Sequence, residues 1–192
     1  MVNFLKIKPY SVKPVPERPC KVSISRIPSL EDGNYRIYSA YLPESKKPAG
    51  YMRCRPTHVI KGDEVIKSLY ISDLYSSSRG CGIGTALLDF AQDLSRENGC
   101  GGNIHLVASG CYAPEKVPHL FYRKYGMNTG DKFIDNKIDR FIKTGKKATR
   151  LDFDEVKMFY PPVKYPKKNN IFSRVMRFVG SLFNSCKKGV VR

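Results

Sequence analysis

The sequence predicts an α+β fold in which a mixed, mainly antiparallel sheet is flanked by helices and followed by a basic amphipathic extension. Three observations lead to this expectation. Apolar and polar residues alternate in short runs between residues 20 and 75, as in strands that bury one face. The apolar period changes to that of a helix over residues 83–94. A glycine-rich loop, residues 79–84, lies where the period changes.

Four strands are expected before that helix. The first begins near Cys20, and the second covers residues 35–41 after an Asp-Gly-Asn turn signal. The third covers residues 51–55, and the fourth runs from about residue 65 to residue 75 after a Lys-Gly-Asp turn. Because short turns join successive strands, we expect the four strands to pair as an antiparallel meander.

Beyond the helix, the pattern alternates between strand and helix. Residues 104–108 form a short apolar run typical of a strand, and residues 156–160 predict a last strand. Between them, residues 114–125 predict a short helix that ends at Gly126 and contains a proline in its first half. No pattern decides the Asp- and Lys-rich residues 128–150.

Proline content and charge divide the 192 residues into three parts. We expect a Pro- and Lys-rich lead-in at residues 1–19, one folded domain at residues 20–160 and an extension at residues 161–192. The extension carries eight basic side chains and no acidic one, whereas residues 56–130 carry seven of each, so the net charge of +17 is loaded at the ends. Such flanks favour an anionic partner without specifying a chemistry.

The extension contains an amphipathic segment at residues 170–183. Its apolar side chains fall on one helical stripe: Ile171, Phe172, Val175, Val179, Leu182 and Phe183. A basic helix of this kind could dock on its own domain, form a homodimer, lie on an anionic membrane surface or bind nucleic acid. These alternatives stay open from the sequence.

Hydropathy and cysteine spacing indicate a cytoplasmic protein. No apolar run approaches the roughly 18 residues of a membrane span, and the first residues lack the apolar core of a signal peptide. The six cysteines are scattered without a C-x-x-C pair, which argues against a zinc ribbon and against a dense disulfide framework. We therefore expect free thiols and no metal.

The most informative segment is the loop at residues 79–85, with the sequence RGCGIGT. Glycines let the backbone approach a ligand closely, and the N–H groups at a helix N-terminus attract a phosphate. A Walker loop would require a lysine after Gly84, and a dinucleotide fingerprint would require a glycine at position 85. Position 85 is Thr, so neither pattern fits.

The loop and a later aromatic segment together resemble the GNAT superfamily of acetyl-CoA-dependent N-acetyltransferases. Arg79, Gly82 and Gly84 fit its Arg/Gln-x-x-Gly-x-Gly/Ala loop, which cradles the coenzyme pyrophosphate. Residues 120–127, LFYRKYGM, resemble its Phe-Tyr-x-x-x-Gly-Phe segment, with Met in the last position. The resemblance covers residues 20–160 and implies an acyltransferase that uses acetyl-CoA as co-substrate.

The resemblance also implies roles for individual residues. Leu74 matches the position whose backbone N–H meets the acetyl carbonyl, and Tyr122 matches the general acid that protonates the departing thiolate. Tyr125 is a neighbouring rival for that role, and packing beside Phe121 is the other interpretation of Tyr122. The residues implied to bind the coenzyme are Leu74, Arg79, Gly80, Cys81, Gly82, Ile83, Gly84 and Thr85.

No comparable match identifies the general base. We select Asp73, on the fourth strand beside the implied acetyl site, with Glu64 near the start of that strand as the alternative. Either residue could equally be an ordinary surface carboxylate. His119 lies three residues before Tyr122 and could line the acceptor site or be structural. His105 has no partner in the sequence.

Two departures from the superfamily pattern bear on activity. Glu115 stands where Asn is common, and Pro118 stands where a small residue is expected. The function we expect is transfer of an acetyl group to a primary amine of a small molecule or protein. The alternatives are acetylation of an aminoacyl-tRNA amine and a non-catalytic binding module on the same fold. Acceptor pockets vary freely on one fold, so the sequence leaves the acceptor open.

Overall fold

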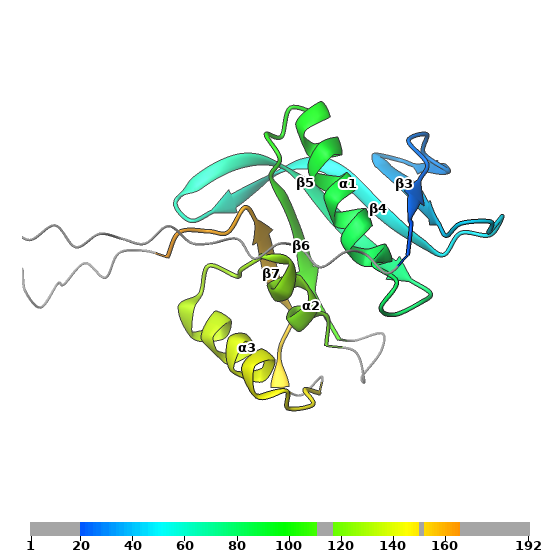
Figure 1. Cartoon of the computed structure of the whole chain (residues 1–192). Helices are drawn as coiled ribbons and strands as arrows, with labels where there is room; N and C mark the ends of the chain where they lie inside the picture. The colour runs from blue at the N-terminus through cyan, green and yellow to red at the C-terminus, as the bar shows by residue number, and fades with distance from the viewer. Residues whose placement is uncertain (1–19, 111–116, 150–151, 166–192) are drawn as a thin grey trace, which may run out of the picture. The chain divides into compact units, whose positions relative to one another are not determined.

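The computed structural model describes residues 20–110, 117–149 and 152–165 (Figure 1). The predicted lead-in and the amphipathic segment of the extension lie outside the described residues. The chain forms two compact units, of which the first holds the described residues up to Thr57 together with residues 67–106. The second holds residues 58–66 and the described residues from Val107 onward. The predicted division at residues 20 and 160 stays a prediction.

The secondary structure confirms the α+β class. The elements in chain order are β1 (Ser23–Ile24), β2 (Leu30–Asp32), β3 (Tyr35–Tyr41), β4 (Gly50–Lys61), β5 (Glu64–Ser76), α1 (Ile83–Glu97), β6 (Ile104–Ala108), α2 (Pro118–Tyr125), α3 (Lys132–Thr144) and β7 (Val156–Tyr160). No helix among the described residues is both long enough and apolar enough to cross a membrane.

The sheet of the first unit contains the predicted meander. β3 pairs antiparallel with β1 and β4, and β4 lies next to β5. The first strand is shorter than expected, with two residues, and the unpredicted β2 also pairs with β3. β2 has only three residues, which is too short to show a period. β4 continues to Lys61 instead of ending at Arg55. Pro56 cannot donate a ladder hydrogen bond, but it lies within the strand and does not end it.

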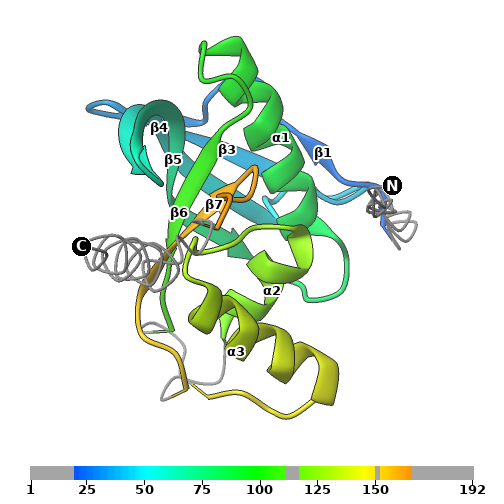
Figure 2. The ribbon, with the colours of Figure 1, turned by 90° about the vertical axis from the view of Figure 1, so that its left-hand side faces the viewer.

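Helix α1 packs on one face of this sheet, and Figure 2 shows it lying across the strands. Of the predicted apolar stripe, Ile83, Ala86, Leu87, Ala91 and Leu94 are buried and Phe90 is half-buried, and Leu88 is buried in addition. The Phe90 ring meets the ring of Tyr38 edge-on, with 5.1 Å between centroids. Tyr38 is the register partner of Met52, which is fully buried, so these two strand positions define the face that α1 covers.

The connection from β5 through α1 to β6 is a parallel crossover, and β6 has the predicted bounds. The register joins Leu69 to Ile104, Tyr70 to His105 and Ile71 to Leu106. A parallel pair needs a crossover of about a dozen residues or more, usually a helix, which α1 provides. The glycine-rich loop therefore lies between the end of β5 and the first turn of α1.

The second unit contains α2, α3 and β7, of which α2 and β7 were predicted. Helix α2 begins at Pro118, so this proline occupies the first turn. Its missing N–H costs no helical hydrogen bond at that position. Glu115 lies outside the described residues. The unpredicted α3 buries Asp135 completely, and a polar residue on the buried face hides the apolar period.

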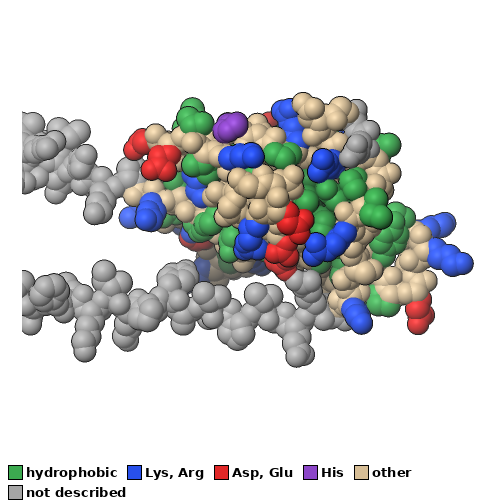
Figure 3. Space-filling model, turned by 90° about the horizontal axis from the view of Figure 1, so that it is seen from above, with side chains coloured by type: hydrophobic (Ala, Val, Ile, Leu, Met, Phe, Trp, Pro, Cys, Tyr) green, Lys and Arg blue, Asp and Glu red, His purple; other side chains and the backbone are tan. Residues whose placement is uncertain are grey.

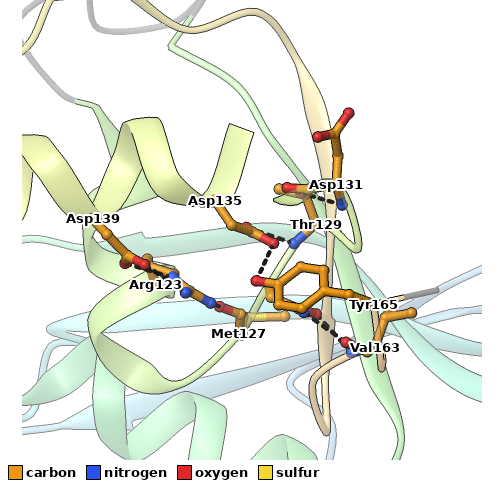
Figure 4. A network of polar contacts seen from close by, with 9 residues as sticks. Arg123, Met127, Thr129, Asp131, Asp135, Asp139, Val163 and Tyr165 are labelled. Carbon is orange, nitrogen blue, oxygen red and sulfur yellow. Dashed lines mark hydrogen bonds and ion pairs between the residues drawn. The ribbon is translucent and has the colours of Figure 1, made fainter. Parts of the chain in front are cut away.

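A polar network holds the second unit together (Figure 4). Arg123 of α2 donates two hydrogen bonds of 2.7 Å to the carboxylate of Asp139 on α3, and this pairing raises the pKa of Arg123. Asp135 accepts from the Thr129 N–H at 3.0 Å and from the Tyr165 hydroxyl at 2.9 Å. These bonds fix the segment before α3 and the last described residue onto α3.

Candidate functional site

The loop between β5 and α1 has the geometry of an anion-binding helix start. Gly80 has φ of 80° and Gly82, the N-cap of α1, has φ of 73°, both in the left-handed region that favours glycine. Because the N-cap is a glycine, no side chain caps the first turn, and no acidic residue lies there. The N–H groups of Ile83, Gly84 and Thr85 thus precede the first helical bond, from Ala86 to Gly82.

The strand end that carries the loop is fixed to β4. The N–H of Ser77 donates to the carbonyl of Ala49 at 2.9 Å, and its hydroxyl donates to the same oxygen at 2.7 Å. Gly50 follows directly and lies against the first residue of α1, with no room for a side chain. The loop therefore starts from a fixed point.

A second cysteine lies beside the loop. The thiol of Cys20 is hydrogen-bonded to that of Cys81, and this bond is the main reason why the pKa of Cys20 is raised. Both residues are half-buried, and both are free thiols, as are the buried Cys54 and Cys100. The expectation of free thiols is thus confirmed for the four described cysteines.

Leu74 and Asp73 lie near the end of β5. Leu74 is half-buried and stands three residues beyond Ile71, the last position of the recorded β5–β6 register. The Asp73 side chain is 47% exposed. Its carboxylate accepts a hydrogen bond of 2.8 Å from Ser72 and lies 3.8 Å from Nη1 of Arg53. Both residues therefore lie on the strand that leads into the loop.

The predicted general acid belongs to the second unit. Tyr122 lies in α2 and is 8% exposed, and this burial raises its pKa to about 12. Its ring contacts the ring of Phe121 at 5.3 Å, and within the described chain its hydroxyl has no hydrogen-bond partner. Tyr125, the rival, packs its half-buried ring against Tyr160 at 5.7 Å.

His119 is a buried structural residue of the second unit. It is 1% exposed, its Nε2 lies 2.9 Å from the carbonyl oxygen of Asp154, and its ring stacks on Phe153 at 5.2 Å. Burial lowers its pKa, against the opposing effect of the Asp154 carbonyl. Glu64, the alternative base, is an exposed residue at the opposite end of β5 from Leu74.

Residues that the sequence did not single out lie on the sheet with Arg53, the ion-pair partner of Asp73. The guanidinium carbons of Arg53 and Arg55 lie 3.9 and 4.7 Å from the ring centroid of Tyr35. His105, which had no partner in the sequence, has two in the structure, because its Nδ1 lies 2.9 Å from the Ser68 hydroxyl and its ring stacks on that of Tyr70. Alternation along β4 was the only signal that could have placed both arginines on one face.

Comparison with known proteins identifies a family over most of the chain. The model of the acetyltransferase (GNAT) family matches residues 6–127. No curated protein matches the sequence significantly.

Three solved structures illustrate the similarity. A transcriptional regulator from Bacillus halodurans C-125 is 20% identical, with a TM-score of 0.40, over 53% of this chain and 65% of that one. Naa50 of Arabidopsis thaliana, solved with the bisubstrate analogue CoA-Ac-MVNAL, is 26% identical, with a TM-score of 0.36, over 50% of this chain and 58% of that one. NAA60 of the same plant, solved with a bisubstrate analogue, is 12% identical, with a TM-score of 0.44, over 73% of this chain and 98% of that one. The chain thus spans less than two thirds of the length of the first two.

Proposed function

The chain belongs to the acetyltransferase (GNAT) family, and from that premise we propose that it moves an acetyl group from acetyl-CoA to a primary amine of a small molecule or protein. The observation that carries the proposal is the start of α1. Two glycines with positive φ expose uncapped N–H groups there, without an acidic side chain in the first turn. Such a site suits a pyrophosphate.

The coenzyme would be held by the loop and the strand before it. The backbone N–H groups of Gly80 to Thr85 would donate hydrogen bonds to the pyrophosphate oxygens, with the exposed Arg79 adding a positive charge. A Cβ atom on Gly80 would meet nothing within 4 Å, so the space beside the loop is open. The N–H of Leu74 would polarise the thioester carbonyl, because a donor aimed at the developing oxyanion lowers the barrier to attack.

Tyr122 is the proposed proton donor to the departing thiolate. Because burial raises its pKa to about 12, the hydroxyl keeps its proton throughout the neutral range. The absence of a hydrogen-bond partner for the hydroxyl among the described residues leaves it available to a ligand. The unpaired hydroxyl favours a donor role over simple packing, whereas burial would raise the pKa in either case.

Asp73 is the proposed general base. Its side chain is half exposed and lies beside the guanidinium of Arg53, where the carboxylate could take a proton from the amine, directly or through water. The nucleophile is then the neutral amine, whose nitrogen forms the new amide bond as the carbon–sulfur bond breaks.

A thiol-release assay with acetyl-CoA and a panel of amines tests the proposal. The wild-type chain should release coenzyme thiol, and Tyr122→Phe should lower kcat by about 100-fold or more. Tyr125→Phe is the matched control and should leave kcat nearly unchanged. Calorimetric titration with coenzyme A provides a second readout, in which Arg79→Ala should weaken binding while Tyr122→Phe does not.

The outcomes separate the alternatives. Absence of coenzyme binding would overturn the proposed function altogether. Coenzyme binding without turnover on small amines, peptides or aminoacyl-tRNA would favour the non-catalytic module. Turnover on aminoacyl-tRNA alone would replace the proposed acceptor class while leaving the roles of Arg79 and Tyr122 in place.

A further inference from the structure

One face of the first unit's sheet carries tyrosines and arginines side by side. We call it the tyrosine–arginine face. Ring stacking, cation–π contacts and the electrostatic coupling of Tyr70 to its neighbours link its members, which are Tyr35, Tyr51, Arg53, Arg55, Tyr70 and Tyr75. The β3–β4 register pairs Ser39 with Tyr51 and Ile37 with Arg53, so alternate residues of these strands share this side. α1 packs on the other side, where Phe90 meets Tyr38.

The aromatic rings and guanidinium groups of this face are stacked. The Tyr51 and Tyr75 rings are stacked at 5.4 Å with 25° between planes. The guanidinium of Arg53 lies over the Tyr35 ring at 3.9 Å, and that of Arg55 lies 4.7 Å from the same ring. Planar groups held in this way offer flat surfaces on which another planar group can stack.

The face is accessible to a ligand. Tyr51 and Tyr75 are 40% and 48% exposed, which is unusual for large aromatic side chains because burying them is favourable. Tyr70 and Arg55 are half-buried. Two stacked, exposed tyrosines beside two arginines are therefore available to a partner.

The charge of the face suits an anion. Arg53 shares the carboxylate of Asp73 at 3.8 Å, whereas no described carboxylate forms a salt bridge with Arg55. The buried Nε of Arg55 has no hydrogen-bond acceptor among the described residues, so the donor capacity of this guanidinium is incompletely used. The guanidinium groups of Arg53 and Arg55 therefore carry two positive charges, against the one negative charge of Asp73.

The spacing of the flat groups on this face suits single-stranded rather than double-stranded nucleic acid. Tyr51, Arg53 and Arg55 alternate along β4, so neighbouring members are separated by about 6.6 Å. Bases in a duplex are stacked at about 3.4 Å and hide their faces from side chains. Only a strand with unstacked bases can place one base on each flat group.

We propose that the tyrosine–arginine face binds single-stranded nucleic acid. Bases stack on the Tyr51–Tyr75 pair and on the guanidinium planes, and phosphates contact the N–H groups of Arg55. Arg53 of this face pairs with the proposed base Asp73, but single-strand binding is measured without acetyl-CoA, so its outcome does not depend on the proposed function.

Fluorescence anisotropy with a labelled 12-nucleotide RNA of mixed sequence tests the proposal on the full chain. The single strand should bind more tightly than a duplex of the same sequence. The paired substitution Tyr51→Leu with Tyr75→Leu should weaken single-strand binding by about 5- to 150-fold, the range for loss of stacking under a base. Arg55→Lys, which keeps the charge and removes the plane, should also weaken it.

Matched controls separate stacking from general attraction by the basic flanks. Phe133→Leu removes a 79% exposed aromatic ring of α3, and Arg96→Lys changes an exposed arginine of α1, so neither should alter binding. The tyrosine substitutions should leave the slope of log K against log salt unchanged, because they remove no phosphate contact. Circular dichroism and urea unfolding should show that each variant is folded.

Three results would overturn the proposal. The first is equal affinity for single strand and duplex, and the second is wild-type affinity in the folded Tyr51→Leu, Tyr75→Leu variant. The third is displacement of the RNA by a polyglutamate peptide at similar concentration with the same sensitivity to these variants, which would assign the face to an acidic protein segment.

Discussion

Gly50, the first residue of β4, lies so close to Ile83, the first residue of α1, that a Cβ atom added to it would be 2.6 Å from the Ile83 Cγ2. The same atom would be 2.6 Å from the carbonyl oxygen of Tyr75. The start of α1 is therefore positioned by a close approach of backbone that only glycine permits.

We predict that Gly50→Ala lowers the free energy of unfolding by about 1–3 kcal/mol, the usual cost of overpacking. Because the strain falls on the residue that begins α1, coenzyme A affinity should fall as well. Urea unfolding and calorimetry measure the two effects. Gly33→Ala is the control, since it has positive φ but no atom within 4 Å, and it should lose stability without losing affinity. Wild-type stability in Gly50→Ala would contradict the packing described here.

Asp135 supports the second unit through two donors, and its removal should be costly. Asp135→Ala leaves the Thr129 N–H and the Tyr165 hydroxyl without their acceptor, which should cost about 2–4 kcal/mol of unfolding free energy. Tyr165→Phe removes one donor and should cost about 1 kcal/mol. Urea unfolding provides the measurement, and Asp154→Ala, at an exposed carboxylate, is the control. Equal losses for Asp135→Ala and Asp154→Ala would refute this account.

His119 should make stability fall in acid. Burial lowers its folded pKa below the unfolded value of about 6.5, so the unfolded chain binds a proton first as the pH drops. His119 therefore leaves the free energy of unfolding unchanged above about pH 6.5. Its destabilising effect grows as the pH falls from there to the folded pKa, and it stays constant at lower pH. Urea midpoints at pH 7.5 and 5.0 should differ less in His119→Gln than in the wild type. An identical pH dependence in the two proteins would exclude His119 as a source.

The role of Asp73 can be separated from its ion pair. If Asp73 acts as the proposed general base, Asp73→Asn should lower kcat by about 100-fold with little change in KM. Asn still accepts the hydrogen bond from Ser72, so the strand should stay in place. Glu64→Gln is the matched control at the other end of β5. A kcat for Asp73→Asn within a few-fold of wild type would assign the carboxylate to its contact with Arg53 alone.

Alkylation of the loop thiol, Cys81, provides a test of coenzyme binding. Cys81 is half-buried within the glycine-rich loop, so coenzyme A should slow its alkylation by iodoacetamide several-fold, as followed by peptide mass spectrometry. Cys54 is 1% exposed and its pKa is raised to about 12, so it should not react in the native chain and provides an internal reference. Protection of Cys81 that does not depend on coenzyme concentration would place the pyrophosphate elsewhere.

The net charge of the chain does not identify a binding face on the described sheet and helices. Seen from above, Lys and Arg side chains are scattered among apolar and acidic ones and do not form one patch (Figure 3). The densest basic segment of the chain, residues 161–192, lies mostly outside the described residues. On the face drawn in Figure 3, charge alone therefore does not mark a binding site.

The sequence by itself determined the elements whose side chains alternate with a clear period. The helix at α1, the strands β3, β5, β6 and β7 and the loop between β5 and α1 follow from local patterns, because burial on one face imposes the period. The Arg79–Thr85 segment was also recognisable, since its glycines are required by backbone geometry.

Only the tertiary structure decided which distant residues meet. The partners of His105, the contact of Gly50 with Ile83 and the stacking of arginines on Tyr35 join residues from different strands. α3 escaped prediction because its buried face includes Asp135, a charged residue that is stable there only with donors supplied from outside the helix. Local patterns report burial, but the partners that make a buried polar group or a close approach possible come from the folded chain.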